Sequence, residues 1–368
     1  MRTHPSAAPS SPRHPSEPAL TFVPSLADLG WDPMSIPSSV DAGGLRPARV
    51  TLQGRDVWRV HDGVAEHVVA VRGRLRASSE LPVAGDWVLL GGAPDGYVVE
   101  LVLPRRSALV RKAAGARTEA QVVAANVDVV LVCAPAHSLN PRRLERELTL
   151  VWESGATPVV VVTKSDLLGD DVVETLAEVR DVAIGVDVLA VSSYDGDGLD
   201  AVRALLPPGT TGAVIGPSGA GKSTLVNALV GEQLLATTAV RESDHRGVHT
   251  TTARHLVPLP GGGLVLDTPG MRELALWADD DALEATFVDV DEIARDCRFS
   301  DCSHESEPGC AVLQAVSDGV LDDDRLASWR KLQRELAHLA RKQDVLLRNE
   351  ERKKWARITR EARSRSKP

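Results

Sequence analysis

The sequence has few aromatic residues, few cysteines and no long apolar run, and each shortage narrows the class of protein. Aromatic residues make up 3% of the 368 positions, so the core must consist mostly of Val, Leu and Ala. No apolar stretch reaches the roughly 18 to 20 residues of a membrane-spanning helix, and no apolar signal-peptide core opens the chain. Four cysteines do not make a disulfide scaffold at this length, and three of them cluster, which favours a metal site. We therefore expect a cytoplasmic protein of two or three domains.

The C-terminal end is basic, whereas the rest of the chain is acidic. Residues 325–368 hold 15 Lys and Arg against 5 Asp and Glu, a net charge of +10. The whole chain has a net charge of −9, so the other 324 residues carry −19. An acidic body with one basic end favours a polyanionic partner. Residues 325–360 are predicted to form a helix that packs on the body through one apolar face. That face consists of Leu326, Trp329, Leu332, Leu336 and Leu339.

The N-terminal part resembles a tail followed by a small barrel. Nine of the 23 prolines fall within residues 1–47, which predicts a disordered extension over residues 1–45. We interpret it as passive, because its few charges do not argue for an arm that contacts a polyanionic partner. Residues 46–104 read as short Val-rich strands, which predicts a barrel of the OB type or another small β-barrel. Four basic residues follow, and they either contact phosphate or form a solvated linker: Arg105, Arg106, Arg111 and Lys112.

Residues 122–270 alternate between apolar strands and helices, which predicts a parallel sheet with helices on both faces. One of these strands is followed by Gly216-Pro217-Ser218-Gly219-Ala220-Gly221-Lys222-Ser223, which matches the phosphate-binding loop G-x-x-x-x-G-K-[ST]. Its backbone N–H groups and the next helix would bind phosphates. Lys222 would reach the β- and γ-phosphates as a catalytic cation, and Ser223 would bind Mg²⁺. The adjoining Thr224 is counted with the nucleotide-binding residues.

A base-recognition motif precedes this loop, which reverses the usual order of a GTPase. Thr163-Lys164-Ser165-Asp166 ends an earlier apolar run. The carboxylate of Asp166 can accept the N1–H and the exocyclic amine of guanine, and adenine lacks that donor pair. Thr163 stands where Asn is commoner, and its hydroxyl has a shorter reach. Ser192 and Ser193 end the next strand, where a backbone N–H can contact the base.

Two further segments are expected to respond to the γ-phosphate. Asp267-Thr268-Pro269-Gly270 ends a strand, so Asp267 is placed to hold Mg²⁺ and the N–H of Gly270 to contact the γ-phosphate. Residues 246–252 include His249-Thr250-Thr251 and are predicted to be a switch segment, in which Thr250 or Thr251 completes the magnesium site. Met271 cannot orient water, so we assign that catalytic role to His249.

The clustered cysteines fit a structural zinc site. Cys297, Cys302, His304 and Cys310 offer three thiolates and one imidazole within fourteen residues. Such a set closes a tetrahedral shell and leaves no position open for catalysis. Free cysteines in a loop are the alternative. Cys133, within an apolar strand, is expected to be a core residue.

Together these motifs resemble the small-ribosomal-subunit-dependent GTPases of the RsgA or YjeQ type. The resemblance runs from about residue 46 to 340 and includes the reversed motif order, Ala124-Ala125-Asn126-Val127-Asp128 and the Cys/His set. It implies an N-terminal OB-type β-barrel, a circularly permuted P-loop α/β GTPase domain and a C-terminal α-helical zinc-binding domain. The bounds we expect are a tail over 1–45, the RNA-binding OB-fold over 46–110, the GTPase domain over 111–275, the zinc-binding domain over 276–345 and a basic end over 346–368.

The resemblance also implies a function in the late maturation of the small (30S) ribosomal subunit. We expect GTP hydrolysis stimulated by that subunit, release on hydrolysis and 16S rRNA as the main contact. The cofactors would be GTP or GDP, Mg²⁺ and one structural Zn²⁺. We expect a monomer that binds neither DNA nor membranes. One alternative is a zinc and OB-fold RNA-binding module whose nucleotide site is only a conformational lock, and another is an ATP-using enzyme, against which Asp166 argues.

Overall fold

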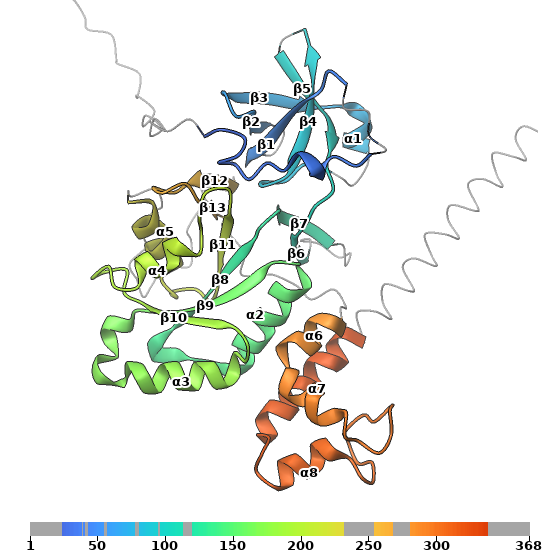
Figure 1. Ribbon diagram of the computed structural model, residues 1–368, viewed down its shortest axis with the longest axis vertical. Helices are drawn as coiled ribbons and strands as arrows, with labels where there is room; N and C mark the ends of the chain where they lie inside the picture. The colour runs from blue at the N-terminus through green and yellow to red at the C-terminus, as the bar shows by residue number, and fades with distance from the viewer. Residues whose placement is uncertain are drawn as a thin grey trace, which may run out of the picture.

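The computed structural model has three parts, a barrel, a central α/β domain and a helical domain, arranged in that order along the molecule (Figure 1). It describes residues 24–38, 40, 43–54, 57–77, 81–94, 96–112, 120–231, 254–267 and 280–337. The predicted switch residues, Gly270 and the end of the chain after residue 337 lie outside these ranges. Among the described helices, none is long and apolar enough to cross a membrane.

The first part is a closed five-stranded barrel, as predicted. Its strands follow the order β1-β2-β3-β5-β4, and β4 pairs again with β1 to close the ring. Alternate Val, Leu and Trp side chains fill its interior, where Val50, Trp58 and Val99 are almost fully buried. A short helix, α1, lies between β3 and β4. The bounds are β1 (Arg46–Gln53), β2 (Trp58–His61), β3 (Glu66–Val71), α1 (Gly73–Ala77), β4 (Trp87–Ala93) and β5 (Gly96–Val102).

The central part is a sheet with the order β10-β9-β8-β11-β13-β12, in which β12 is antiparallel to β13 and the others are parallel. The strands that precede the phosphate loop in the chain lie on one side of β11, which confirms the permuted fold. Helices α2 and α3 cover one face through Leu144, Leu148 and Val179, and α4 and α5 cover the other. The bounds are β8 (Val129–Pro135), α2 (Pro141–Glu153), β9 (Thr157–Thr163), α3 (Val172–Val182), β10 (Asp187–Val191), α4 (Leu199–Ala204), β11 (Thr211–Ile215), α5 (Lys222–Val230), β12 (Arg254–Pro258) and β13 (Leu264–Asp267).

The barrel and the central sheet are joined through backbone pairing and a buried arginine. Strand β1 pairs antiparallel with β12, so the two sheets form one continuous sheet of eleven strands. Arg49 is fully buried and donates hydrogen bonds to the carbonyls of Leu29, Gly85 and Asn126. Burial lowers the pKa of Arg49 to about 10. A single side chain thus connects the N-terminal segment, the barrel and the central α/β domain.

The structure of the N-terminal half differs from the sequence-based expectations in three respects. The tail predicted over residues 1–45 is too long. Leu29 is buried in the main core, and the ring centroid of Trp31 lies 4.7 Å from that of Trp87. Arg105 is not available to phosphate, because its guanidinium donates to both carboxylate oxygens of the buried Asp86, at 2.8 and 2.7 Å. The region after the barrel also forms a hairpin of β6 (Ala108–Lys112) and β7 (Ala120–Ala125) rather than a plain linker.

The third part is a small helical domain. Its core consists of Leu283, Phe287, Val290, Val312 and Leu326, with Leu332 and Leu336 of the last described helix. The predicted apolar face of that helix is confirmed as far as it is described, and Leu339 lies outside the described residues. The bounds are α6 (Asp280–Thr286), α7 (Val288–Ala294), α8 (Ala311–Ser317) and a helical segment over 323–337.

Candidate functional site

The phosphate loop follows β11 and turns into α5, as its sequence predicts. Gly216 has a φ of 133°, and a Cβ there would lie 2.5 Å from the carbonyl oxygen of Cys133. Gly219 and Gly221 also have positive φ, at 78° and 80°. Glycine is required because these conformations and this close approach exclude a side chain. The loop therefore presents its backbone to the same point as the N-terminus of α5, an arrangement that binds phosphate.

The predicted phosphate-contacting side chains sit at this turn. Lys222 Nζ lies 2.8 Å from the carbonyl oxygen of Gly216 and 2.6 Å from that of Pro217, so its ammonium group is held within the loop. Ser223 and Thr224 follow in the first turn of α5. Asp267 ends β13, beside the strand that leads into the phosphate loop. Of the predicted magnesium ligands, Asp267 thus ends the strand next to β11, and Ser223 follows β11 and the phosphate loop in the first turn of α5.

Thr163 connects the base-recognition motif to the phosphate loop. Its buried hydroxyl donates a 2.8 Å hydrogen bond to the carbonyl oxygen of Ala220. A hydroxyl has one proton, so Thr163 has none left to donate to a base. The residue that stands in place of the usual Asn is therefore a tether between the two motifs. The sequence indicated a hydrogen bond here but not its partner.

The remaining residues of the predicted base site follow the ends of β9 and β10. Lys164 adopts a left-handed conformation with a φ of 61°, which turns the chain into the short helix η3 (Ser165–Leu167) and leaves Asp166 exposed. Strand β10 runs parallel to β9 with Val191 opposite Thr163, so Ser192 and Ser193 lie beside this turn. The N–H of Ser192 donates to the carbonyl oxygen of Asp197, so this N–H is not free for the predicted backbone contact with the base.

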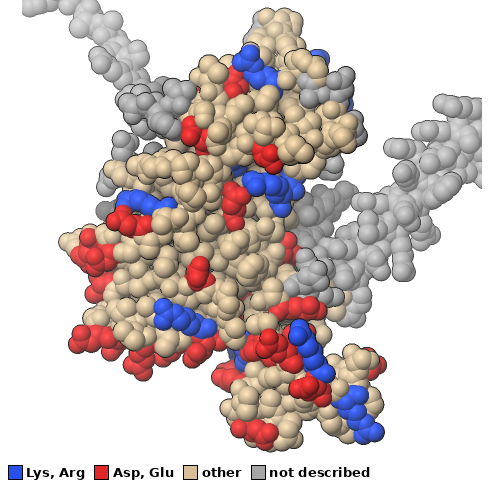
Figure 2. Space-filling model, viewed as in Figure 1, with Lys and Arg blue, Asp and Glu red and all other residues tan. Residues whose placement is uncertain are grey.

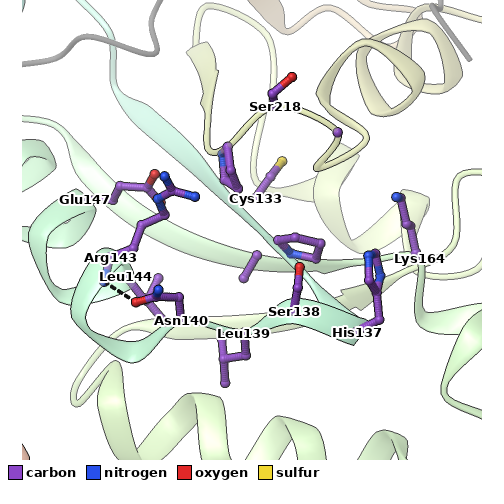
Figure 3. A pocket seen from close by; sticks show the side chains of 14 residues that line it. Cys133, His137, Ser138, Leu139, Asn140, Arg143, Leu144, Glu147, Lys164 and Ser218 are labelled. Atoms are coloured by element: carbon purple, nitrogen blue, oxygen red, sulfur yellow. Dashed lines mark hydrogen bonds between the residues drawn. The ribbon is translucent and has the colours of Figure 1, made fainter. Parts of the chain in front are cut away.

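A cavity of about 330 Å³ lies between the phosphate loop and α2, and the sequence did not reveal it (Figure 3). Pro217, Ser218 and Gly219 line one side, and Arg143 and Glu147 of α2 line the other. Burial raises the pKa of Glu147 to about 7, against the opposing charges of Arg143 and Lys222. The four-residue spacing of Arg143 and Glu147 on a helix was the available signal, but it also fits a solvated face.

Cys133 lies at the end of β8 on the floor of this cavity. It is fully buried, and burial raises the pKa of its thiol to about 12. A thiol with this pKa stays protonated and unreactive near neutral pH. The prediction that Cys133 is a core residue is confirmed.

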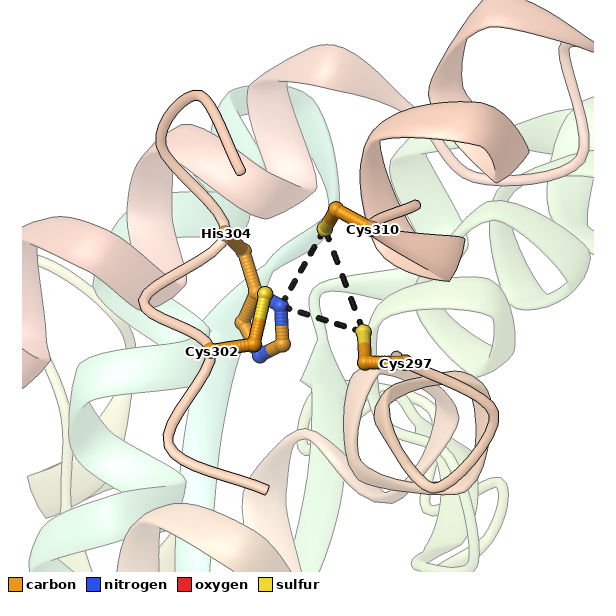
Figure 4. A group of neighbouring side chains, drawn as sticks. All are labelled: Cys297, Cys302, His304 and Cys310. Carbon is orange, nitrogen blue, oxygen red and sulfur yellow. Dashed lines mark hydrogen bonds between the residues drawn. The ribbon is translucent and has the colours of Figure 1, made fainter. Parts of the chain in front are cut away.

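The predicted zinc ligands converge in the helical domain (Figure 4). Their ligand atoms all lie within 4.8 Å of one another. Cys310 Sγ lies 3.9 Å from Cys297 Sγ and 3.4 Å from His304 Nδ1. Tetrahedral zinc with bonds of about 2.3 Å would hold its sulfurs about 3.8 Å apart. The donor set and its spacing therefore fit a closed structural zinc site.

The loop that carries these ligands is braced by Glu307. Its carboxylate accepts hydrogen bonds from the N–H groups of Ser303, Glu305 and Ser306, at 2.9, 2.9 and 3.0 Å, and from the Ser303 hydroxyl. These donors hold the pKa of Glu307 well below its usual range. His304 has a φ of 56°, which the brace maintains. The loop is therefore shaped by its own hydrogen bonds around the ligand positions.

Comparisons with known proteins agree with this geometry. The family profile described as RsgA GTPase matches residues 102–277, and one described as 50S ribosome-binding GTPase matches residues 211–349. The chain is 44% identical to the small ribosomal subunit biogenesis GTPase RsgA of Streptomyces avermitilis, over 95% of this chain and 93% of that protein. It is also 44% identical to RsgA 1 of Oceanobacillus iheyensis, over 85% and 91%.

Solved structures support the same assignment. YjeQ from Thermotoga maritima is similar with a TM-score of 0.61 and 26% identity, over 80% of this chain and 99% of that chain. YloQ, described as a circularly permuted GTPase, is similar with a TM-score of 0.59 and 26% identity, over 80% and 96%. With the reversed motif order, the phosphate loop and the barrel all present, the chain belongs to the RsgA GTPase family and is a GTP-hydrolysing enzyme.

Proposed function

We propose that the protein acts on the small (30S) ribosomal subunit during its late maturation, with 16S rRNA as its main contact. GTP hydrolysis is stimulated by the subunit, and the protein leaves once GTP is hydrolysed. The relatives in Oceanobacillus and Streptomyces are named for the biogenesis of the small ribosomal subunit, which supports this subunit as the partner. The basic end of the chain supports a polyanionic partner. We propose further that the protein acts as a monomer in the cytoplasm and binds neither DNA nor membranes.

The observation that carries the proposal is that α2 contacts both the phosphate loop cavity and the zinc-binding domain. One face of α2 presents Arg143 and Glu147 to the cavity. Two other residues of α2 contact the zinc-binding domain. Arg146 donates 2.5 and 2.9 Å hydrogen bonds from its guanidinium to Glu335, and Glu145, on the far side of the helix from Arg143, accepts from Arg325 at 3.0 Å. A change at the γ-phosphate thus has a short physical route to the domain that carries the basic end.

Each predicted domain has its own proposed role. The OB-fold over 46–110 and the zinc-binding domain over 276–345 bind the RNA, and the basic end over 346–368 adds contacts with RNA phosphates. The GTPase domain over 111–275 hydrolyses GTP and so sets when the protein leaves the subunit. Ser223, Asp267 and Thr251 would hold Mg²⁺, and His249 would orient the attacking water. Zn²⁺ stabilises the fold of its domain and takes no part in hydrolysis. Loss of the γ-phosphate at Gly270 changes the pose of the zinc-binding domain.

GTP hydrolysis by the full-length protein tests the proposal when measured alone, with purified small subunits and with large subunits. We expect at least tenfold stimulation by small subunits only, which corresponds to about 1.4 kcal/mol of barrier lowering. The protein should also co-sediment with small subunits in a non-hydrolysable GTP analogue and be released in GDP. His249→Ala should bind GTP normally but lose the stimulation.

The alternative function makes the opposite prediction. If the nucleotide site is only a conformational lock of an RNA-binding module, small subunits will leave turnover unchanged while the nucleotide still alters subunit binding. A response to large subunits, or to neither, would also contradict the proposal. Lys222→Ala serves as the control, since it should abolish turnover under every condition.

A further inference from the structure

We propose that Tyr194 stacks on the guanine base and is a main source of nucleotide affinity in this protein. Tyr194 is 89% exposed, the largest exposed fraction among the large apolar side chains that the structure describes. It directly follows Ser192 and Ser193, beside the base-recognition turn. The inference rests on the assignment of Asp166 as the residue that recognises guanine.

The loop that carries Tyr194 is ordered by its own hydrogen bonds. The N–H of Ser192 donates to the carbonyl oxygen of Asp197 at 3.0 Å, and the N–H of Gly196 donates back to Ser192 at 2.9 Å. The Ser192 hydroxyl lies 3.1 Å from both the carboxylate and the N–H of Asp195. Gly198 begins the next helix with a φ of 77°, and a Cβ there would lie 2.1 Å from the Ala190 carbonyl oxygen. The backbone at Tyr194 is therefore fixed before any ligand arrives, which lowers the entropic cost of binding.

Strand register places Tyr194 at the base end of the nucleotide site. Val191 is opposite Thr163, so the residues after each strand, Tyr194 on one and Lys164 on the other, lie at the same edge of the sheet. The phosphate loop is tied to this edge by the Thr163 hydroxyl bond to Ala220. A nucleotide whose phosphates occupy the loop consequently extends its base toward Lys164, Asp166 and Tyr194.

The chemistry of the site calls for a contact with the face of the base. Asp166 can bind the N1–H and amine edge of guanine, and the stem of Lys164 can cover one face. Thr163 has no proton left to donate to the base, because its hydroxyl is bonded to Ala220. An aromatic ring against the second face supplies affinity without reading the base, because every base has a π-face.

Local charge favours a nucleotide base over an RNA strand as the partner of Tyr194. Asp195 and Asp197 follow Tyr194 in the loop, and Asp200 comes next, all exposed. Carboxylates also gather along the side of the body that α3 forms (Figure 2). This field repels a polyanion. A bound nucleotide places its charge at the distant phosphate loop and only its uncharged base near Tyr194.

Calorimetric titration of the full-length protein with GDP and with IDP, which lacks the exocyclic amine, tests the inference. Tyr194→Ala should weaken both affinities by the same factor, about fivefold to hundredfold. Tyr194→Phe should stay within twofold of the wild type. Val173→Ala is the matched control, because Val173 is a comparably exposed apolar residue, 77% exposed, on α3. Asp166→Asn should weaken GDP more than IDP, which verifies the position of the base.

Three results would overturn the inference. Affinities of Tyr194→Ala within twofold of the wild type would show that no stacking occurs, and the GTPase assignment would stand. Unchanged nucleotide affinity with lost stimulation by small subunits would make Tyr194 an RNA contact instead. An Asp166→Asn variant with unchanged GDP affinity would place the base elsewhere, and a wild type that bound no GDP would contradict the proposed function itself.

Discussion

Replacing Arg325 by methionine should detach the zinc-binding domain from the GTPase domain. Arg325 is 8% exposed and donates to the carboxylates of Glu145, at 3.0 Å, and Asp289, at 3.1 and 2.8 Å. It also donates to the carbonyl oxygens of Val182, at 3.2 Å, and Thr286, at 3.0 Å. One guanidinium thus contacts two helices of the GTPase domain and two of the zinc-binding domain.

The expected cost follows from what the substitution leaves behind. Glu145 is 3% exposed, and removing one partner of a buried ion pair costs about 3–5 kcal/mol. Ser328 still donates to Glu145, and Asp289 is partly exposed, so we expect a loss near the lower end, about 3 kcal/mol. Urea denaturation would measure this loss, and hydrogen exchange should quicken in α2 and α7.

Two further variants make the result decisive. Arg142→Met removes an ion pair with Asp324 in which both side chains are more than half exposed, and it should cost at most about 0.5 kcal/mol. The double variant Arg325→Met, Glu145→Met should recover much of the loss, because no buried charge is left unpaired. A loss below about 1 kcal/mol for Arg325→Met, or a double variant as unstable as the sum of the single ones, would refute the reasoning.

The remaining predictions concern the two sites. Thr163→Val should destabilise the GTPase domain by about 1–3 kcal/mol, measured by denaturation, because the Ala220 carbonyl loses its donor; an unchanged midpoint would mean that the tether is dispensable. The raised pKa of Glu147 means that the folded state binds the Glu147 proton more tightly than the unfolded state does. The free energy of unfolding should therefore fall by at most about 3 kcal/mol as pH rises from about 4.5 to about 7, and then level off. Glu147→Gln should flatten that decline, and a parallel decline would assign it to other groups. Cys302→Ser or a chelator should remove one zinc per chain, measured by mass spectrometry. The near-ultraviolet circular dichroism of Trp329 should also weaken, because the ring centroid of Trp329 lies 5.3 Å from that of His304. A domain that keeps this signal without metal would contradict a structural role for zinc.

The features predicted well from the sequence are those set by short spacing. The phosphate loop needs glycines at fixed steps, and Gly216 and Gly221 have the positive φ values that the motif requires. The zinc ligands fall within fourteen residues, so their spacing almost determines their geometry. The parallel sheet was predicted in the same way, from continuous apolar strands that alternate with helices along residues 122–270. In each case the physical constraint acts between neighbours in the chain.

The features that were missed depend on pairs far apart in the sequence. Thr163 and Ala220 are 57 residues apart, and Glu145 and Arg325 are 180 apart. A threonine or an arginine has many possible partners, and composition does not choose among them. The N-terminal tail was predicted too long for the same reason, since the many prolines gave no sign that Leu29 is buried in a core formed by distant residues.

The attachment points of the two outer domains connect the reversed motif order to the proposed switch. The barrel joins the central sheet at β12, which lies in the chain between the predicted switch residues 246–252 and the Asp267 motif. The zinc-binding domain joins at α2, beside the phosphate loop cavity. In a sheet of backbone hydrogen bonds, a displacement of β12 must carry β1 with it or break the pairs between Leu52 and His255 and between Gln53 and Arg254. Both outer domains are thus attached to elements that adjoin the predicted γ-phosphate end of the site, so under the proposed function one hydrolysis event would change both RNA contacts together.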